Sequence, residues 1–205
     1  MLNIFKKKKS KTSKDIFWDW FIDNKSKIEK FIQNPDIGGE IYEELTQKIK
    51  EYNELLYPEL MIEKDGTYIL IITPDGISKG VKPTQELAEN HPEIKNWIVK
   101  KFRQPTDNVS MGIDGVEYSS DDIEILHELN EEKDKVDIRV FIRNMNKNEK
   151  GYQHLAFLYF DHILGEFNTI TRVGYIEFFD LESDKTINDS INLLELRKFI
   201  EKELY

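Results

Sequence analysis

The sequence contains no cysteine among its 205 residues, and it contains no long uninterrupted apolar run. The first absence excludes disulfide bonds, thiolate metal sites and cysteine nucleophiles. The second excludes a membrane-spanning helix, which needs roughly 18 consecutive apolar residues. A signal peptide is not expected either, because Leu2, Ile4 and Phe5 precede the first lysines instead of following them. We therefore expect a cytoplasmic protein without a transmembrane segment.

Well-marked catalytic motifs are also missing. The chain has no GxxxxGK[ST], no GxGxxG after a strand, no HExxH, no GxSxG and no EF-hand loop. These absences exclude the best-marked nucleotide-dependent enzymes, zinc proteases and α/β hydrolases. Aromatic residues do not alternate with arginines as they do on RNA-binding sheets. The sequence accordingly predicts no cofactor and no nucleic-acid partner.

Charge is unevenly distributed along the chain. The net charge is −10, yet six of the 29 basic residues are lysines within residues 1–14. The remaining chain therefore has 23 basic and 39 acidic side chains, a balance of −16. An acidic body repels nucleic acids and anionic membranes and attracts basic proteins. Residues 1–14 are expected to form a flexible basic tail, in which Lys6–Lys9 could make weak contact with a membrane surface.

The composition is 39% hydrophobic and 12% aromatic, which is typical of a globular protein. We predict a single α+β domain over residues 15–205, with a mainly antiparallel or mixed sheet. Helical patterns follow Thr12 and Ile41, a short helix is expected over 84–89, and a final helix over 189–204. Asp65-Gly66 and Asp114-Gly115 indicate two hairpins, the first with a type I′ turn. The strand over 68–72 is apolar on both faces, which predicts a central position, and 97–103 is expected to form a further strand.

The strongest strand signal lies between residues 123 and 142. Apolar residues alternate along two runs, which places them on one face of a hairpin: Ile123, Ile125, His127 and Leu129 on the first strand, and Val136, Ile138, Val140 and Ile142 on the second. A register that pairs Glu124 with Arg143 and Glu128 with Arg139 brings opposite charges together. His127 then points inward beside Val140, where a hydrogen-bonded core histidine is expected more often than a catalytic one.

The segment 151–180 places ionisable residues in the most apolar part of the chain. The pattern predicts a buried helix over 152–164 that ends at Gly165, followed by a strand over 173–179. Asp161, His162, Glu166 and Arg172 lie within or between these elements. Because an unpaired buried charge is costly, these side chains should reach solvent, pair with one another or serve a function.

Three interpretations of this segment remain open. Its side chains could hold a metal ion or perform acid–base chemistry in a hydrolase, with His154, Asp161, His162 and Glu166 as the candidate set. Alternatively, Arg172 pairs with Glu166 or Asp161, and a cationic His162 caps the helix C-terminus. The segment could also form part of a recognition surface. We favour the structural interpretation, which assigns no catalytic residue and no metal site.

The run FLYFDHILGEFNTITRVGYIEF resembles a segment of small uncharacterised bacterial proteins, in which an apolar helix ends in an acidic residue and LGE before a TRVGxIxF strand. The matching positions are Asp161, Leu164, Gly165, Glu166, Thr171, Arg172, Val173, Gly174, Ile176 and Phe178. This resemblance implies a compact bacterial protein of one domain. It carries no activity and no catalytic residues.

These observations favour a non-catalytic protein of the immunity or antidote type, in which an acidic surface engages a basic protein partner. A metal-dependent hydrolase using the cluster of His154, Asp161, His162 and Glu166 is the first alternative. A peripheral membrane-associated scaffold that uses the lysine-rich tail is the second.

Overall fold

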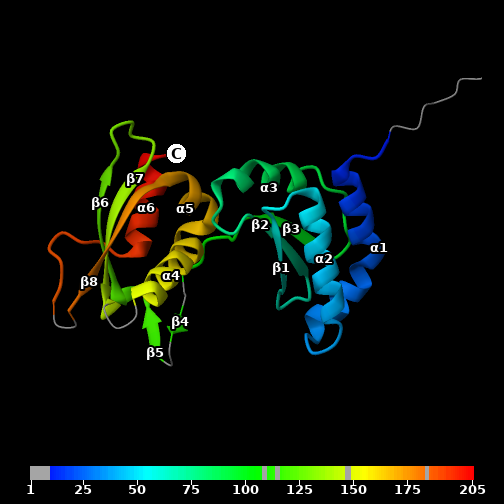
Figure 1. Ribbon diagram of the computed structural model, residues 1–205, viewed down its shortest axis with the longest axis horizontal. Coiled ribbons are helices and arrows are strands. Elements are labelled where there is room, and N and C mark those ends of the chain that lie inside the picture. The colour runs from blue at the N-terminus through cyan, green and yellow to red at the C-terminus, as the bar shows by residue number, and fades with distance from the viewer. Residues whose placement is uncertain (1–9, 108–109, 114–115, 146–148, 183–184) are drawn as a thin grey trace, which may run out of the picture.

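The computed structural model describes residues 10–107, 110–113, 116–145, 149–182 and 185–205. It confirms the α+β class, and it shows two three-stranded sheets that are both mixed instead of mainly antiparallel. The two sheets lie in two halves of the molecule, which are joined by the segment after β3 (Figure 1). None of the described helices is both long and apolar enough to cross a membrane.

The N-terminal half consists of helices packed on the first sheet. Its elements are α1 (Ser13–Gln33), α2 (Gly39–Tyr52), β1 (Tyr57–Ile62), β2 (Tyr68–Thr73), η1 (Ser78–Gly80), α3 (Val81–Ala88) and β3 (Trp97–Lys101). Strand β2 is central, antiparallel to β1 and parallel to β3, and all six of its residues are buried. This confirms the central strand that its apolar sequence predicts.

Helix α1 begins where the sequence predicts. Thr12 and Asp15 form a capping box, in which the Thr12 hydroxyl accepts from the Asp15 N–H and the Asp15 side chain accepts from the Thr12 N–H. Lys11 pairs with Asp19, and the Lys14 ammonium donates to the Glu86 and Glu89 carbonyls at the end of α3. Lys6–Lys9 lie outside the described residues.

The hairpin between β1 and β2 forms at Asp65-Gly66, but its turn is not type I′. Only Gly66 has a positive φ, of 86°, whereas a type I′ turn requires a positive φ at both central residues. The Gly66 N–H donates to the Glu63 carbonyl, and the Glu63 N–H donates to the Thr67 carbonyl. The loop therefore spans more than the Asp-Gly pair, with glycine at its left-handed position. The arms of the second predicted hairpin also pair, although Asp114-Gly115 itself lies outside the described residues.

The C-terminal half contains the second sheet, in the order β6-β7-β8. Its elements are β4 (Ser110–Ile113), β5 (Val116–Ser119), η2 (Ser120–Asp122), β6 (Ile123–Leu129), β7 (Val136–Arg143), α4 (Glu149–Phe160), η4 (Asp161–Gly165), α5 (Glu166–Arg172), β8 (Val173–Leu181) and α6 (Leu193–Glu203). Helix α6 begins at an Asn192–Glu195 capping box, four residues later than the sequence predicts. Strands β6 and β7 are antiparallel, and β7 and β8 are parallel.

The predicted register of β6 and β7 is wrong by two residues. Glu124 lies opposite Phe141, and His127 lies opposite Ile138 instead of beside Val140. The alternation is nevertheless correct, because a shift of two residues keeps every side chain on its own face. Glu124 still meets Arg143 diagonally, at 2.8 Å between carboxylate oxygen and guanidinium nitrogen.

The predicted helix over 152–164 is mostly buried and ends at Gly165, as the sequence predicts, but the residues after it form a second helix instead of a turn. Helix α4 widens into a π-helical turn at η4, and α5 follows directly. Gly165 has φ +82° and ψ 138°, a conformation that L-residues rarely adopt, so it redirects the backbone between the two helices. The segment is therefore helix, π-turn and helix before β8 begins.

Each half has its own hydrophobic core. The first core combines α1 and α2 with one face of the first sheet, and Phe21, Leu45 and Leu70 are fully buried there. The second core places α4 and α6 on one face of the second sheet, with Val140, Tyr159 and Leu196 fully buried. Polar interactions occupy the boundary between the two halves, as described next.

Candidate functional site

The main candidate site is a cluster of charged side chains around Arg103, at the boundary between the halves. Arg103 follows β3, and Asp75 follows β2, so both lie at the carboxyl ends of the two parallel strands. Open sheets commonly bind ligands at this position. Phe102 has a positive φ of 63°, and its N–H donates to the Ile72 carbonyl, which ends β3 and directs Arg103 toward the second half.

The Arg103 guanidinium donates to three carboxylates at once. Nε lies 2.7 Å from Glu59 Oε1, Nη1 lies 3.0 Å from Asp161 Oδ2, and Nη2 lies 2.8 Å from Asp75 Oδ1. Nη1 is also 3.8 Å from Glu166 Oε1. The rigid fork of a guanidinium suits such convergent acceptors. Arg103 is consequently saturated by carboxylates from both halves and is not free to bind an anionic ligand.

Glu166 is fully buried and joins the two halves by hydrogen bonds. Its Oε1 accepts from the Thr73 hydroxyl at 2.6 Å and from the Gly76 N–H at 3.0 Å, and its Oε2 accepts from the Arg103 N–H at 3.1 Å. The Glu166 N–H in turn donates to the Arg103 carbonyl. A carboxylate with this many donors is well compensated for its burial.

Asp161 has an unusual ionisation equilibrium. Burial raises the pKa of Asp161 to about 6, the nearby Glu166 charge adds to this effect, and Arg103 opposes it. Arg103 itself is desolvated, but its hydrogen bonds to Asp75 and Glu59 outweigh that effect and keep the pKa of Arg103 above its ordinary value. The cluster holds four carboxylates against one guanidinium, so its charge is negative near neutral pH.

The structure brings only part of the predicted site together. Asp161 and Glu166 meet at Arg103, and His162 lies close enough that burial and Arg103 lower its pKa while Glu59 opposes them. Burial and Arg103 therefore disfavour the cationic form that the predicted cap at His162 requires. His154 lies on the wall of the adjacent cleft.

Arg172 and His127 lie elsewhere. The predicted pairing of Arg172 with Glu166 or Asp161 is wrong, because Arg103 takes that place. The Arg172 guanidinium instead lies 5.2 Å from the centre of the Tyr205 ring, and its Nε is buried without a hydrogen-bond partner. His127 packs edge-on against Phe199 at 4.4 Å, and burial lowers its pKa. His127 is only partly buried and lines a cleft of about 360 Å³, and its partner is a ring instead of the hydrogen-bonding group that the sequence predicts.

Sequence reasoning does not identify Arg103, Glu59 or Asp75. Arg103 ends a predicted strand, and Asp75 belongs to a Pro-Asp-Gly turn, so each has an ordinary local explanation. The available signal is that Asp75 and Arg103 each come shortly after a strand. That signal gains meaning only when the parallel pairing of β2 and β3 is known.

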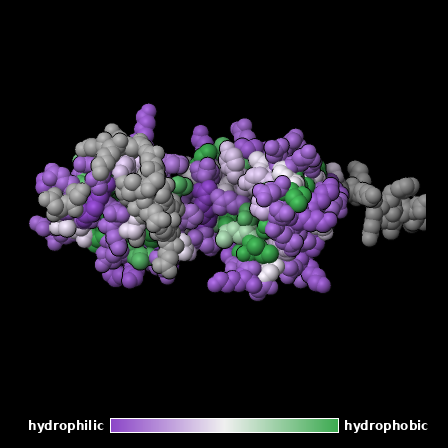
Figure 2. All heavy atoms as spheres, turned by 90° about the horizontal axis from the view of Figure 1, so that it is seen from below, coloured by the Kyte–Doolittle hydropathy of each residue, from purple (hydrophilic) through white to green (hydrophobic). Residues whose placement is uncertain are grey.

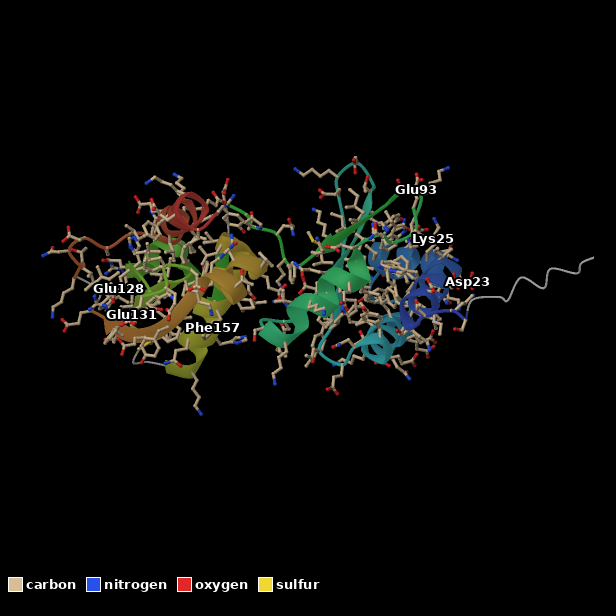
Figure 3. All side chains as sticks on the ribbon, turned by 90° about the horizontal axis from the view of Figure 1, so that it is seen from above. Asp23, Lys25, Glu93, Glu128, Glu131 and Phe157 are labelled. Atoms are coloured by element: carbon tan, nitrogen blue, oxygen red, sulfur yellow. The ribbon has the colours of Figure 1, made fainter. Side chains whose placement is uncertain are left out.

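A cleft of about 520 Å³ lies beside the cluster. Its polar wall includes Arg103, Asp75 and Asp161, and its apolar wall includes Phe157 and Ile77, which are 44% and 39% exposed. Phe157 lies on the side of the C-terminal half that faces the N-terminal half (Figure 3). Clefts with apolar walls and a few convergent polar groups are the usual binding sites of proteins.

No metal centre accompanies this cleft among the residues that the structure describes. Within those residues, no three His, Asp or Glu side chains are grouped so that they could hold a metal ion. The carboxylates of Asp161 and Glu166 are directed at Arg103 and at backbone donors instead. Comparison of the chain with protein-family models, with curated proteins and with solved structures gave no match.

Proposed function

We propose that the protein is a non-catalytic, cytoplasmic protein-binding protein of the bacterial immunity or antidote type, whose acidic surface engages a basic protein partner. The observation that carries this proposal is the Arg103 cluster. Four carboxylates surround one guanidinium, so the cleft of about 520 Å³ beside the cluster is negative, and Arg103, the arginine on its wall, is occupied. Such a site attracts cations and repels phosphates.

The charge of the whole chain has the same sign as that of the cleft. The balance of −16 outside residues 1–14 extends the negative field well beyond the cleft. Hydrophilic side chains cover most of the face shown in Figure 2. A field of one sign increases the rate at which a partner of opposite charge associates. The resemblance of residues 157–178 to a segment of small bacterial proteins agrees with this proposal.

A catalytic alternative has less support. The candidate residues Asp161 and Glu166 are engaged with Arg103, Thr73 and backbone N–H groups, and His154 and His162 do not join them in a ligand set. We therefore do not propose the metal-dependent hydrolase. We also do not propose the membrane-associated scaffold, because two lysines of the tail, Lys11 and Lys14, interact with the folded chain.

The test is the salt dependence of partner binding. The immobilised protein is exposed to cell extract at about 0.01 M and at about 1 M ionic strength, where the Debye length is about 30 Å and about 3 Å. We expect a basic protein to bind at low salt, and the purified pair to show an affinity that falls as salt rises. Binding of an acidic partner, or an affinity that salt does not change, contradicts the proposal.

A pair of charge variants sharpens this test. Asp75 is 58% exposed in its side chain and belongs to the cleft, whereas Glu43 is exposed on α2 in the same half. Asp75→Asn should weaken the purified complex more than Glu43→Gln, although both remove one negative charge. Equal effects would assign binding to overall charge alone.

A further inference from the structure

The four edges of the two sheets are protected to different degrees. An unprotected edge strand exposes backbone groups that can pair with another chain, so proteins usually block edges with proline, lysine or a covering segment. Edge strand β1 contains Pro58, and edge strand β3 contains Lys100 and Lys101. Edge strand β6 is covered by Ile191, whose N–H and carbonyl both bond to Ile125.

Strand β8 is less protected than the other edges, since within the described residues its protection consists of a bulge at its start and the charges of Glu177 and Asp180. Its nine residues, VGYIEFFDL, include neither proline nor lysine, and no described strand pairs with its outer side. A bulge at Gly174 and Tyr175 shifts the register with β7, and the Tyr175 N–H donates to the Asp137 side chain at 2.7 Å. The bulge affects only the start of the strand, since Ile176 to Leu181 pair regularly with Ile138 to Arg143.

The start of this strand also forms a wall of the cleft beside Arg103. Val173, Gly174 and Ile176 line one side of the cleft, and Phe157 from α4 lies close to them. The Phe157 and Phe178 rings meet edge-on at 5.6 Å, which connects the cleft to the inner side of β8. A groove between an edge strand and a helix is a recurrent site for strand addition by a peptide.

The charges near β8 indicate which chain would fit. Glu177 is exposed on the outer face of the strand, where Arg139 of β7 lies opposite it in the register, and Asp75 and Asp161 lie at the cleft, where both pair with Arg103. The acidic side chains on this edge and cleft still outnumber the two arginines. A second copy of this chain would place Glu177 and a body of charge −16 against the same charges, which opposes self-pairing. An extended basic segment has the complementary charge.

We propose that β8 binds an extended segment of a basic partner protein, which adds a fourth strand to the second sheet. Basic side chains of that segment meet Glu177 on one face, and apolar side chains pack against Ile176, Phe178 and Phe157 on the other. The inference rests on the proposed function and assigns its binding site.

The test uses the full chain and a synthetic peptide as long as β8, in which valine and lysine alternate. Hydrogen exchange of backbone amides is measured with and without the peptide. We expect exchange over Tyr175–Leu181 to slow at least about tenfold, with no change in β3, the lysine-bearing edge of the other sheet. Two control peptides replace lysine by glutamate or carry N-methylated backbone amides, and neither should protect β8.

A matched pair of variants identifies the charge that matters. Glu177→Lys reverses an exposed charge on β8, and Glu43→Lys makes the same change on α2. The first should weaken peptide binding by at least about tenfold, and the second should weaken it only slightly.

The outcomes separate this inference from the proposed function. Peptide binding without protection of β8 overturns the inference but leaves a basic partner possible. The same holds if the N-methylated peptide protects β8 as strongly as the unmodified peptide. Absence of peptide binding also overturns it, and the salt test of the purified complex then decides the proposed function separately. Protection of β8 that increases with protein concentration alone would assign the edge to a second copy and would overturn the proposed occupant.

Discussion

The two halves of the molecule share one topology but differ in what they leave open. Each contains an antiparallel hairpin, a helical crossover and a third strand parallel to the second strand of the hairpin. In the first half the central strand is buried throughout, and the edges carry Pro58, Lys100 and Lys101. In the second half, α4 and α6 cover one face, while the edge strand β8 contains no proline or lysine and no described strand pairs with its outer side.

The crossovers explain where the polar cluster forms. The first crossover begins with the Asp75-Gly76 turn and contains the short α3, whereas the second contains α4, a π-turn and α5. The π-turn and Gly165 place Asp161 and Glu166 opposite Arg103. The first half thus supplies the cation and the second supplies its two most buried partners. The same topology therefore provides a closed scaffold in one half and an accessible groove in the other.

The largest expected effect comes from removing the shared cation. Arg103→Met leaves Asp161 and Glu166 without their guanidinium, and loss of one partner from a buried ion cluster typically costs about 3–5 kcal/mol of unfolding free energy. Arg197→Met is the control, because its partners Asp107 and Glu201 are exposed and the loss should stay within about 1 kcal/mol. Urea unfolding monitored by circular dichroism measures both. Similar losses in the two variants would show that the cluster does not join the halves.

Core substitutions test whether the halves unfold together. Leu45 and Leu196 are fully buried in the first and second core, and replacing either by alanine should cost about 2–5 kcal/mol. For a single domain, each variant should show one transition, and hydrogen exchange should accelerate in both halves. If only the substituted half exchanges faster, the chain contains two independently folding units.

The backbone at Gly165 should tolerate alanine poorly. A Cβ there would lie 3.0 Å from Pro105 Cδ, and the φ of +82° with ψ of 138° is unfavourable for alanine, so Gly165→Ala should cost about 1–3 kcal/mol. Gly66 has a similar φ of +86° and open space around it. Gly66→Ala should therefore cost less, about 1 kcal/mol. The difference between the two losses of unfolding free energy, measured by thermal unfolding, reports the combined cost of the ψ of 138° and the Pro105 contact at Gly165. Equal losses would show that neither feature constrains Gly165 more than Gly66.

Local signals in the sequence predict much of the fold. Thr12 and Asp15 predict the start of α1, and alternation over 123–142 predicts the correct faces of β6 and β7. The register is wrong because the alternation is unchanged by a shift of two residues. The turn decides it: Asn130 Oδ1 accepts from the N–H groups of Asp134 and Lys135, and Lys133 adopts a positive φ.

The site is predicted less well than the fold. Apolar surroundings correctly draw attention to Asp161 and Glu166, which are both buried. The apolar surroundings do not identify the arginine that pairs with these two carboxylates. Arg172 is close to them in sequence, whereas Arg103 is close only in space. That proximity depends on the parallel pairing of β2 with β3 and on the π-turn at η4, and neither has a local signal.

The last expected effect is the pH dependence of stability due to Asp161. Its pKa of about 6 in the folded protein exceeds the ordinary value of 3.8, so between these values the folded state binds more protons than the unfolded state. The contribution of Asp161 therefore favours folding at low pH and is lost as pH rises through about 6, by at most about 1.4 kcal/mol per pH unit.

Asp161→Asn removes this contribution and leaves the carboxylates away from the Arg103 cluster unchanged. The unfolding free energy of the unmodified protein minus that of the variant should fall as pH rises from about 4 to about 6, measured by urea unfolding at each pH. A difference that rises with pH would mean that Arg103 outweighs burial, so that Asp161 is held ionised. A constant difference would mean that folding leaves the pKa of Asp161 at its ordinary value, because the effects of burial and of Arg103 cancel.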